Sequence, residues 1–125
     1  MTTEDDIKSL FDRWNAALQT RDPEAVTALY SSDATLLPTI SNEMRRNHAE
    51  IRDYFEGFLQ RRPRGVVNQS NVRDFGDVAV HSGIYTFEMT MDGETSKVPC
   101  RFTFVYRNEG GEWKILEHHS SAMPE

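Results

Sequence analysis

The residues best suited to proton transfer lie near the end of the chain, in the run Glu117-His118-His119-Ser120. A histidine in an apolar pocket can titrate near neutral pH and act as a general acid or base. His118 is the candidate for that role, and the alternative is a core histidine hydrogen-bonded to a carbonyl or a tyrosine hydroxyl. Adjacent side chains of a strand point to opposite faces, so His118 and His119 cannot easily share one metal ion. With no carboxylate at ligand spacing, we expect no metal site.

Other side chains offer a carboxylate and several hydroxyl groups. In a dry cavity Glu88 would have a raised pKa and fit a general base beside a carbonyl, whereas at a strand end it would be an ordinary surface carboxylate. Tyr30, Tyr54 and Tyr106 are either hydrogen-bond donors to a ligand oxygen or core aromatics whose hydroxyls reach the rim. Cys100 has no partner base in the sequence and is expected to be a small buried residue. No nucleotide or phosphate-loop fingerprint is present, so we expect no cofactor.

Composition limits the classes of partner. The 125 residues predict one domain, 1–125, and seven Phe and two Trp suffice for a packed core. A net charge of −6 argues against binding to nucleic acid or to an anionic membrane. The one basic run, Arg61-Arg62-Pro63-Arg64, follows a predicted helix, where cations favour the negative end of the helix dipole. A single cysteine and no apolar run of about 20 residues indicate a cytoplasmic protein outside the membrane.

Apolar spacing predicts helices in the first half of the chain and strands in the second. We expect helices over 4–20, from Asp22-Pro23, and from Asn47 to Pro63, with a short strand over 34–37. Residues 66–75, 78–91, 97–107 and 112–120 are predicted strands, joined by turns at 76–77, 92–93 and 109–111. Asn42 and Arg45, in the loop before the third helix, are placed to gate or orient a ligand, or belong to a solvated loop.

Loops of three residues at the last two turns would divide the side chains of the sheet between two faces. One face would line a cavity, together with Trp14, Tyr30 and Tyr54 from the first half of the chain. Its strand residues would be Ser82, Ile84, Thr86, Glu88, Cys100, Phe102, Phe104, Tyr106, Leu116, His118 and Ser120. A slip of one residue in either hairpin would change the partners.

The opposite face would also carry large apolar groups, which three helices cannot cover. The candidate cover is a second copy of the chain, paired sheet to sheet about a two-fold axis. The interface would then include Tyr85, Phe87, Arg101, Val105, Ile115, Glu117 and His119.

Several short motifs occur in an order that resembles one superfamily. They include Trp14-Asn15-Ala16-Ala17-Leu18, Leu36-Leu37-Pro38-Thr39, Gly111-Glu112-Trp113 and His118-His119-Ser120-Ser121-Ala122-Met123-Pro124. The chain resembles the nuclear transport factor 2-like and SnoaL-like cone proteins, in particular SgcJ/EcaC-type proteins and the association domain of calcium/calmodulin-dependent kinase II. The resemblance implies a cystatin-like α+β fold, in which a curved, mostly antiparallel sheet wraps N-terminal helices around a central cavity.

Members of this superfamily include isomerases, dehydratases, polyketide cyclases and non-catalytic oligomerisation hubs, so the fold alone does not settle function. The kinase hub has arginines in its cavity where this chain has Thr86, Phe104 and Ser120, so its anion-binding chemistry is not implied here. Two hypotheses remain. The chain either binds a small, largely apolar molecule in its cavity, with His118 as acid or base in an isomerase-, dehydratase- or cyclase-like reaction, or it is a non-catalytic homo-oligomerisation module.

Overall fold

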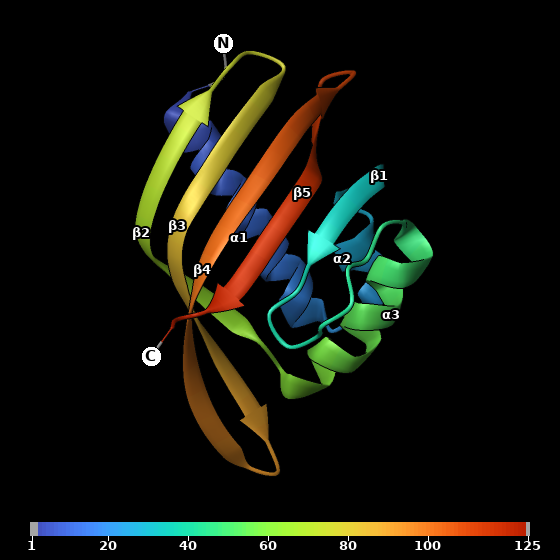
Figure 1. Cartoon of the computed structure of the whole chain (residues 1–125), viewed down its shortest axis with the longest axis vertical. Helices are drawn as coiled ribbons and strands as arrows, with labels where there is room; N and C mark the ends of the chain where they lie inside the picture. Colours follow the sequence, from blue (N-terminus) through green and yellow to red (C-terminus); the bar gives the residue numbers. More distant parts are fainter. Residues whose placement is uncertain (1–2, 125) are drawn as a thin grey trace.

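The computed structural model describes residues 3–124, and its helices pack behind and beside a five-stranded sheet (Figure 1). The helical elements are α1 (Glu4–Thr20), α2 (Pro23–Thr27), α3 (His48–Phe58) and the short 3₁₀ helix η1 (Leu59–Arg61). The strands are β1 (Tyr30–Leu37), β2 (Arg64–Asp74), β3 (Val78–Met91), β4 (Glu94–Glu109) and β5 (Glu112–Ala122). They lie in the order β1-β5-β4-β3-β2, with β1 parallel to β5 and the other neighbours antiparallel. The predicted α+β class with a mostly antiparallel sheet is confirmed.

Side-chain caps fix where the helices begin. The Thr3 hydroxyl accepts a hydrogen bond from the Asp6 amide, while the Asp6 carboxylate accepts one from the Thr3 amide, which is a capping box. Asp22 caps α2, and Asn47 caps α3 by accepting from the Glu50 amide. The predicted extent of the first helix and the predicted starts of the other two are confirmed.

One stripe of α1 faces the sheet and forms the centre of the core. Its buried members, each at most 4% exposed, are Ile7, Phe11, Trp14 and Leu18. The Trp14 ring stacks parallel to Tyr85 with centroids 6.4 Å apart and meets Phe104 edge-on at 5.4 Å. Aromatic rings bury more area than aliphatic side chains, so this layer fills the concave side of the sheet. No helix within residues 3–124 is both long and apolar enough to cross a membrane.

The β3–β4 hairpin closes with a two-residue turn. Met91 pairs with Glu94, and both Asp92 and Gly93 have positive φ, at 52° and 81°. Positive φ at both positions is the type I′ geometry, which matches the natural twist of a hairpin. The three-residue loop predicted here is wrong, and the pairing of β3 with β4 is shifted by one residue.

This shift exchanges the two faces of β3, because side chains alternate along a strand. Tyr85 and Phe87, predicted at the interface, point into the core and are 0% and 3% exposed. Thr86 and Glu88, predicted to line the cavity, lie on the opposite side of the sheet. There Thr86 donates a hydrogen bond to a side chain of β2, and Glu88 pairs with Arg64.

The β4–β5 hairpin also differs from the prediction, but with a smaller effect on the faces. Its turn, Gly110-Gly111, is again two residues long, and a bulge interrupts the ladder between Val105 and Tyr106. The two irregularities together shift the pairing by two residues, so Phe104 lies opposite His118 and not opposite Leu116. A shift of two residues preserves the face.

Beyond the bulge, His118 and Ser120 therefore keep the inward orientation predicted for them, at 2% and 5% exposed. Between the turn and the bulge the faces are exchanged. Ile115, predicted at the interface, is buried in the core, and Leu116, predicted inward, is only half-buried.

Strand β1 begins at Tyr30, four residues before the predicted start, and runs parallel to β5. The segment 38–46 then turns back across the end of the sheet. Two backbone hydrogen bonds between Leu36 and Arg45, of 2.8 and 2.9 Å, close this segment into a loop. The loop brings Thr39 to the inner side of β5, where the candidate site lies.

Candidate functional site

A chain of hydrogen bonds runs through the buried aromatic layer. Trp14 Nε1 lies 3.2 Å from Tyr30 Oη, which lies 2.9 Å from His118 Nδ1. On the other side of the imidazole, His118 Nε2 lies 3.2 Å from Tyr85 Oη. Tyr85 Oη in turn lies 2.6 Å from Ser120 Oγ. We refer to these five residues as the polar chain.

The donors and acceptors fix a direction along the polar chain. The indole N–H of Trp14 can only donate, and the Tyr85 hydroxyl donates to Ser120. His118 Nε2 must therefore carry its proton and donate to Tyr85, which leaves Nδ1 to accept from the Tyr30 hydroxyl. Each member is satisfied only while the imidazole is neutral, because a charged imidazole has no acceptor to offer Tyr30.

Burial favours that neutral form. Loss of solvation, with a smaller contribution from the charge of His119, lowers the pKa of His118 to about 3. Burial also raises the pKa of Tyr30 and of Tyr85 well above the ordinary value. The near-neutral pKa expected for His118 is therefore wrong, and the imidazole is uncharged at physiological pH.

The polar chain ends beside the loop that follows β1. Ser120 Oγ lies 2.5 Å from Thr39 Oγ1. Burial raises the pKa of the Cys100 thiol, and hydrogen bonds from Thr39 and Ser120 offset part of that rise. Cys100 is fully buried, as expected from the sequence.

The space left beside these hydroxyl groups is small. It measures about 10 Å³, room for about one water molecule. Its apolar walls are Trp14, Leu36, Phe55, Phe58 and Phe87, and its polar walls come from the polar chain and Thr39. Small-molecule sites usually provide about 300 Å³ or more. In this conformation the aromatic side chains fill the cone.

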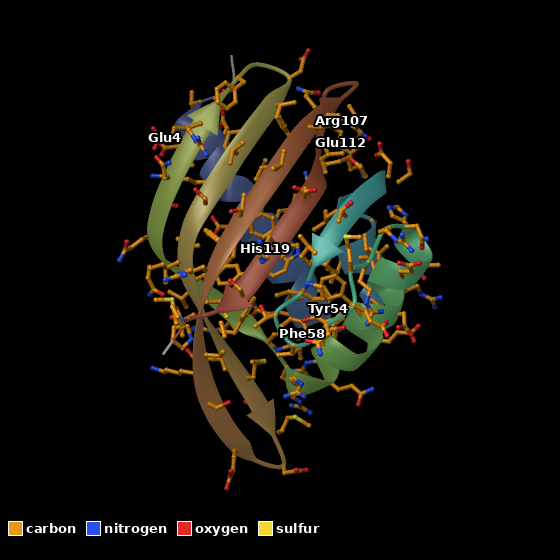
Figure 2. The ribbon with its side chains drawn as sticks, viewed as in Figure 1. Glu4, Tyr54, Phe58, Arg107, Glu112 and His119 are labelled. Carbon is orange, nitrogen blue, oxygen red and sulfur yellow. The ribbon has the colours of Figure 1, made fainter. Side chains whose placement is uncertain are left out.

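Arg45 fastens the loop 38–46 over this space. Its guanidinium donates to Asp53 Oδ2 at 2.8 Å, to the Glu50 carbonyl at 3.1 Å and to Ser41 Oγ at 3.3 Å. The same group lies 5.7 Å from the ring centroid of Tyr54, within cation–π range. Figure 2 places Tyr54 on α3 next to this loop. Arg45 thus holds the loop against α3, whereas Asn42 is exposed.

The structure places the predicted cavity residues in three groups. Trp14, Tyr30, Tyr54, Ser120 and His118 surround the polar chain or its small space. Phe102, Phe104 and Tyr106 lie on the same inner face; the buried Tyr106 hydroxyl has no hydrogen-bond partner among the described residues. Thr86 and Glu88 lie outside. The roles of the first two groups in ligand binding stay predictions. Thr86 and Glu88 do not line the cavity, because they lie on the opposite face of the sheet.

Two polar residues of the site, Tyr85 and Thr39, were not predicted. Tyr85 was assigned to the interface because of the one-residue error in the β3–β4 turn. The signal that would have found it is the Asp92-Gly93 pair, which is typical of a two-residue turn. Thr39 had no local signal beyond its place after Pro38, since only the closed loop brings it to Ser120.

The outer face of the same strands carries smaller and more polar side chains. Three cross-strand rows run over β3, β4 and β5: Val80, Val105 and Glu117; Ser82, Thr103 and His119; Ile84, Arg101 and Ser121. We call these nine residues the outer patch. Figure 2 labels His119 on the front of the sheet, and in Figure 1 the helices lie behind or beside it. The outer patch is therefore open in a single chain.

Metal binding finds no support in the arrangement of side chains. Within residues 3–124, no group of three or more His, Cys, Asp or Glu side chains converges as metal ligands would.

Both the sequence and the structure of the chain are similar to those of known proteins. The sequence profile of the calcium/calmodulin-dependent protein kinase II association domain matches residues 3–124. A crystal structure from Xanthomonas campestris, described as a proposed association domain of that kinase, is 48% identical, with a TM-score of 0.98 over 100% of this chain and 91% of that chain. The chain matches none of the curated proteins.

More distant structures share the fold. A proposed dehydratase of the nuclear transport factor 2-like family from Streptomyces avermitilis has a TM-score of 0.84 at 14% identity, covering 95% of this chain and 94% of that one. A proposed ketosteroid isomerase from Parabacteroides distasonis has a TM-score of 0.75 at 20% identity, covering 98% and 89%. At such identities the likeness shows the fold alone. The nuclear transport factor 2-like, cystatin-like fold expected from the sequence is confirmed.

Proposed function

The chain belongs to the calcium/calmodulin-dependent protein kinase II association-domain family, and from this premise we propose that it is a homo-oligomerisation module. Two copies pair through the outer patches of their sheets. The proposal keeps Arg101, Val105, Glu117 and His119 from the predicted interface, and it leaves out Tyr85, Phe87 and Ile115, which are buried inside the chain.

The observation that carries this proposal is the charge pattern of the outer patch. Arg101 lies in the row at one end of the patch, and Glu117 lies in the row at the other end. The two rows are separated by four residues along a strand. Four residues along a strand span about 13 Å. A two-fold axis through the middle row would bring Arg101 of each copy toward Glu117 of the other. A surface with opposite charges at its two ends complements itself under two-fold symmetry.

The uncharged part of the outer patch fits the same role. Val80 lies directly opposite Val105, with Ile84 four residues further along β3, and all three are half-buried in the single chain. On β3 and β4 the side chains between them are small, Ser82 and Thr103, and His119 extends the same row on β5. A patch that mixes aliphatic and polar groups is typical of protein interfaces that are not part of a folding core.

A charge exchange tests the proposal. We expect Arg101→Glu and Glu117→Arg each to weaken association by about tenfold or more, since each places like charges together across the axis. The double variant restores opposite charges and should recover most of the lost affinity. Sedimentation velocity at several protein concentrations measures this. Single variants with the association constant of the wild type would contradict the proposal.

A second candidate function is binding of a small, largely apolar molecule in the cone. It is favoured by the convergence of the Ser120 and Thr39 hydroxyls on a space whose other walls are largely aromatic and aliphatic. Binding would require Tyr54, Phe58 or the loop 38–46 to move, because the present space holds only about one water molecule. A pKa of about 3 also makes His118 a poor base for an isomerase- or dehydratase-like reaction.

This second function has its own test. A small molecule that co-purifies in stoichiometric amount with the wild type, and is lost from Ser120→Val, would support it. Mass spectrometry of the material released on denaturation detects such a molecule. Protein that is free of any bound molecule, and unaltered in melting temperature by apolar ketones, would contradict it.

A further inference from the structure

We propose that the groove between the end of α1 and the β3–β4 hairpin is a binding site for a small oxyanion, such as the phosphate group of a metabolite. The groove has a volume of about 370 Å³ and is lined by Arg21, Arg62 and Arg64, with Thr90 and Thr95 on the hairpin side. In Figure 1 the hairpin extends past the end of β5, beyond the last turn of α1. This site is independent of the outer patch and of the cone.

The two arginines at the centre of the groove have unusual backbones. Arg21 and Arg62 end α1 and η1 with φ of 62° and 50°, in the left-handed region. Glycine normally occupies such capping positions, because a side chain there costs about 1 kcal/mol or more. The backbone roles alone, N–H donation to Leu18 and Leu59, would be met by glycine at lower cost. The presence of two arginines therefore calls for a role of their side chains.

That role is not to cap the helices. Three carbonyls near the end of α1 accept from groups other than the guanidiniums: Leu18 from the Arg21 amide at 3.1 Å, Ala17 from the Thr20 hydroxyl at 2.7 Å, and Asn15 from the Gln19 amide group at 3.3 Å. Within residues 3–124, neither the Arg21 nor the Arg62 guanidinium makes a hydrogen bond or an ion pair. The interaction of the basic run 61–64 with the negative end of the helix dipole needs no hydrogen bond and stays a prediction.

The nearby carboxylates leave positive charge in excess. Among residues 3–124, Glu88 is the only acidic residue that lines the groove, and it lies 3.4 Å from Arg64. Arg21 and Arg62 also line an adjoining hollow, where the one carboxylate of the described residues, Glu56, lies 3.8 Å from Arg52. Within the described part of the chain, the Arg21 and Arg62 guanidiniums therefore remain uncompensated, although the net charge of the chain is −6.

The chemistry of these groups selects the ligand. Each guanidinium presents a planar fork of N–H donors, and such forks bind phosphate and carboxylate oxygens in pairs. Three forks lie on one side and the Thr90 and Thr95 hydroxyls on the other. These hydroxyls are hydrogen-bonded to each other at 3.0 Å, which leaves one O–H free to donate to a ligand. A tetrahedral dianion can accept from donors in several directions, so a phosphate group fits better than a single carboxylate.

Titration of the intact protein with inorganic phosphate tests the site. Amide chemical shifts would be followed by NMR, with potassium chloride at equal ionic strength as the reference. We expect saturable shifts at the end of α1 and in the β3–β4 hairpin. Arg21→Gln combined with Arg62→Gln should weaken binding by about tenfold or more. Glu88→Gln, which removes the competing carboxylate, should tighten it several-fold.

A matched control separates the groove from general charge effects. Arg46→Gln removes one exposed positive charge elsewhere on the surface and should leave phosphate affinity unchanged. Equal affinity in the wild type and the Arg21/Arg62 double variant would overturn the proposal. So would shifts in phosphate that do not exceed those in chloride, or a loss of affinity in Arg46→Gln as large as in the double variant.

Discussion

The inner and outer faces of β3, β4 and β5 are built from alternate residues of the same strands, yet they differ in almost every property. The inner face carries Tyr85, Phe102, Phe104 and His118, each at most 3% exposed. The outer face carries aliphatic, small and charged side chains that stay partly exposed. Tyr85 and Phe102 stack with ring centroids 4.5 Å apart, whereas no helix in residues 3–124 packs over the outer patch.

This difference separates the two roles of the sheet. The inner face is completed by the chain's own helices, and its polar groups are largely satisfied by one another. It therefore contributes stability and a fixed conformation. The outer face is left open by the chain's own helices, and we propose that a second copy covers it.

The largest expected effect comes from the same substitution on the two faces. Tyr85→Glu would bury an unpaired carboxylate and should lower the free energy of unfolding by more than about 4 kcal/mol. Val105→Glu places the charge at the surface of a single chain and should change that free energy by only about 1 kcal/mol. Thermal unfolding followed by circular dichroism measures both.

The two variants should also differ in what they retain. Val105→Glu is expected to keep the wild-type spectrum, since only association is affected. If Tyr85→Glu were folded and Val105→Glu unfolded, the assignment of the two faces would be inverted.

The next prediction concerns how the free energy of unfolding depends on pH. Burial lowers the pKa of His118 in the folded chain to about 3, against about 6.5 when unfolded. Between these values the unfolded chain binds more protons, so the free energy of unfolding should fall by about 1.4 kcal/mol for each pH unit as the pH drops. Denaturant titrations at pH 7, 6, 5 and 4 measure the slope.

Two variants show whether the slope belongs to the inner face. His118→Gln should be less stable at pH 7 but should have a shallower pH dependence; burial also lowers the pKa of His81, so some dependence remains. His119→Gln, exposed on the outer face, should keep the wild-type slope. A slope that follows His119 instead of His118 would contradict the account.

The smallest expected loss of stability comes from removing one hydroxyl oxygen, that of Tyr85. Tyr85→Phe removes the hydroxyl that joins His118 Nε2 to Ser120 Oγ and leaves both buried groups short of a partner, which should cost about 1 to 3 kcal/mol. Thr86→Val, the neighbouring residue on the outer face, loses a hydrogen bond at the surface and should cost about 0.5 kcal/mol or less. Equal losses in chemical denaturation would show that the polar chain adds no stability.

The sequence predicted those features that depend on local chemistry. The start of α1 and the caps at Asp22 and Asn47 follow from short-range hydrogen bonds that residue types alone specify. The order and approximate extent of the strands follow from apolar runs between glycine-containing turns. These signals suffice for the α+β class and for the inward position of His118.

The errors concern features that local patterns do not determine. A hairpin at Asp92-Gly93 is clear from the sequence, but one residue of loop length decides which face Tyr85 occupies. The bulge between Val105 and Tyr106 shifts the pairing of β4 with β5 by one further residue. The hydrogen bond between Thr39 and Ser120 joins residues 81 positions apart and requires the closed loop. Local sequence patterns therefore predicted only part of the candidate site, and the structure was needed to identify the rest.

The most direct test of the central claim is native mass spectrometry of freshly purified protein without added ligand, with Val105→Glu measured beside it. The account predicts that the wild type is a dimer, or an assembly of dimers, with the mass of the bare chains, and that Val105→Glu is a folded monomer. A wild-type monomer, or a monomer that carries a bound small molecule, would contradict it and return attention to the cone.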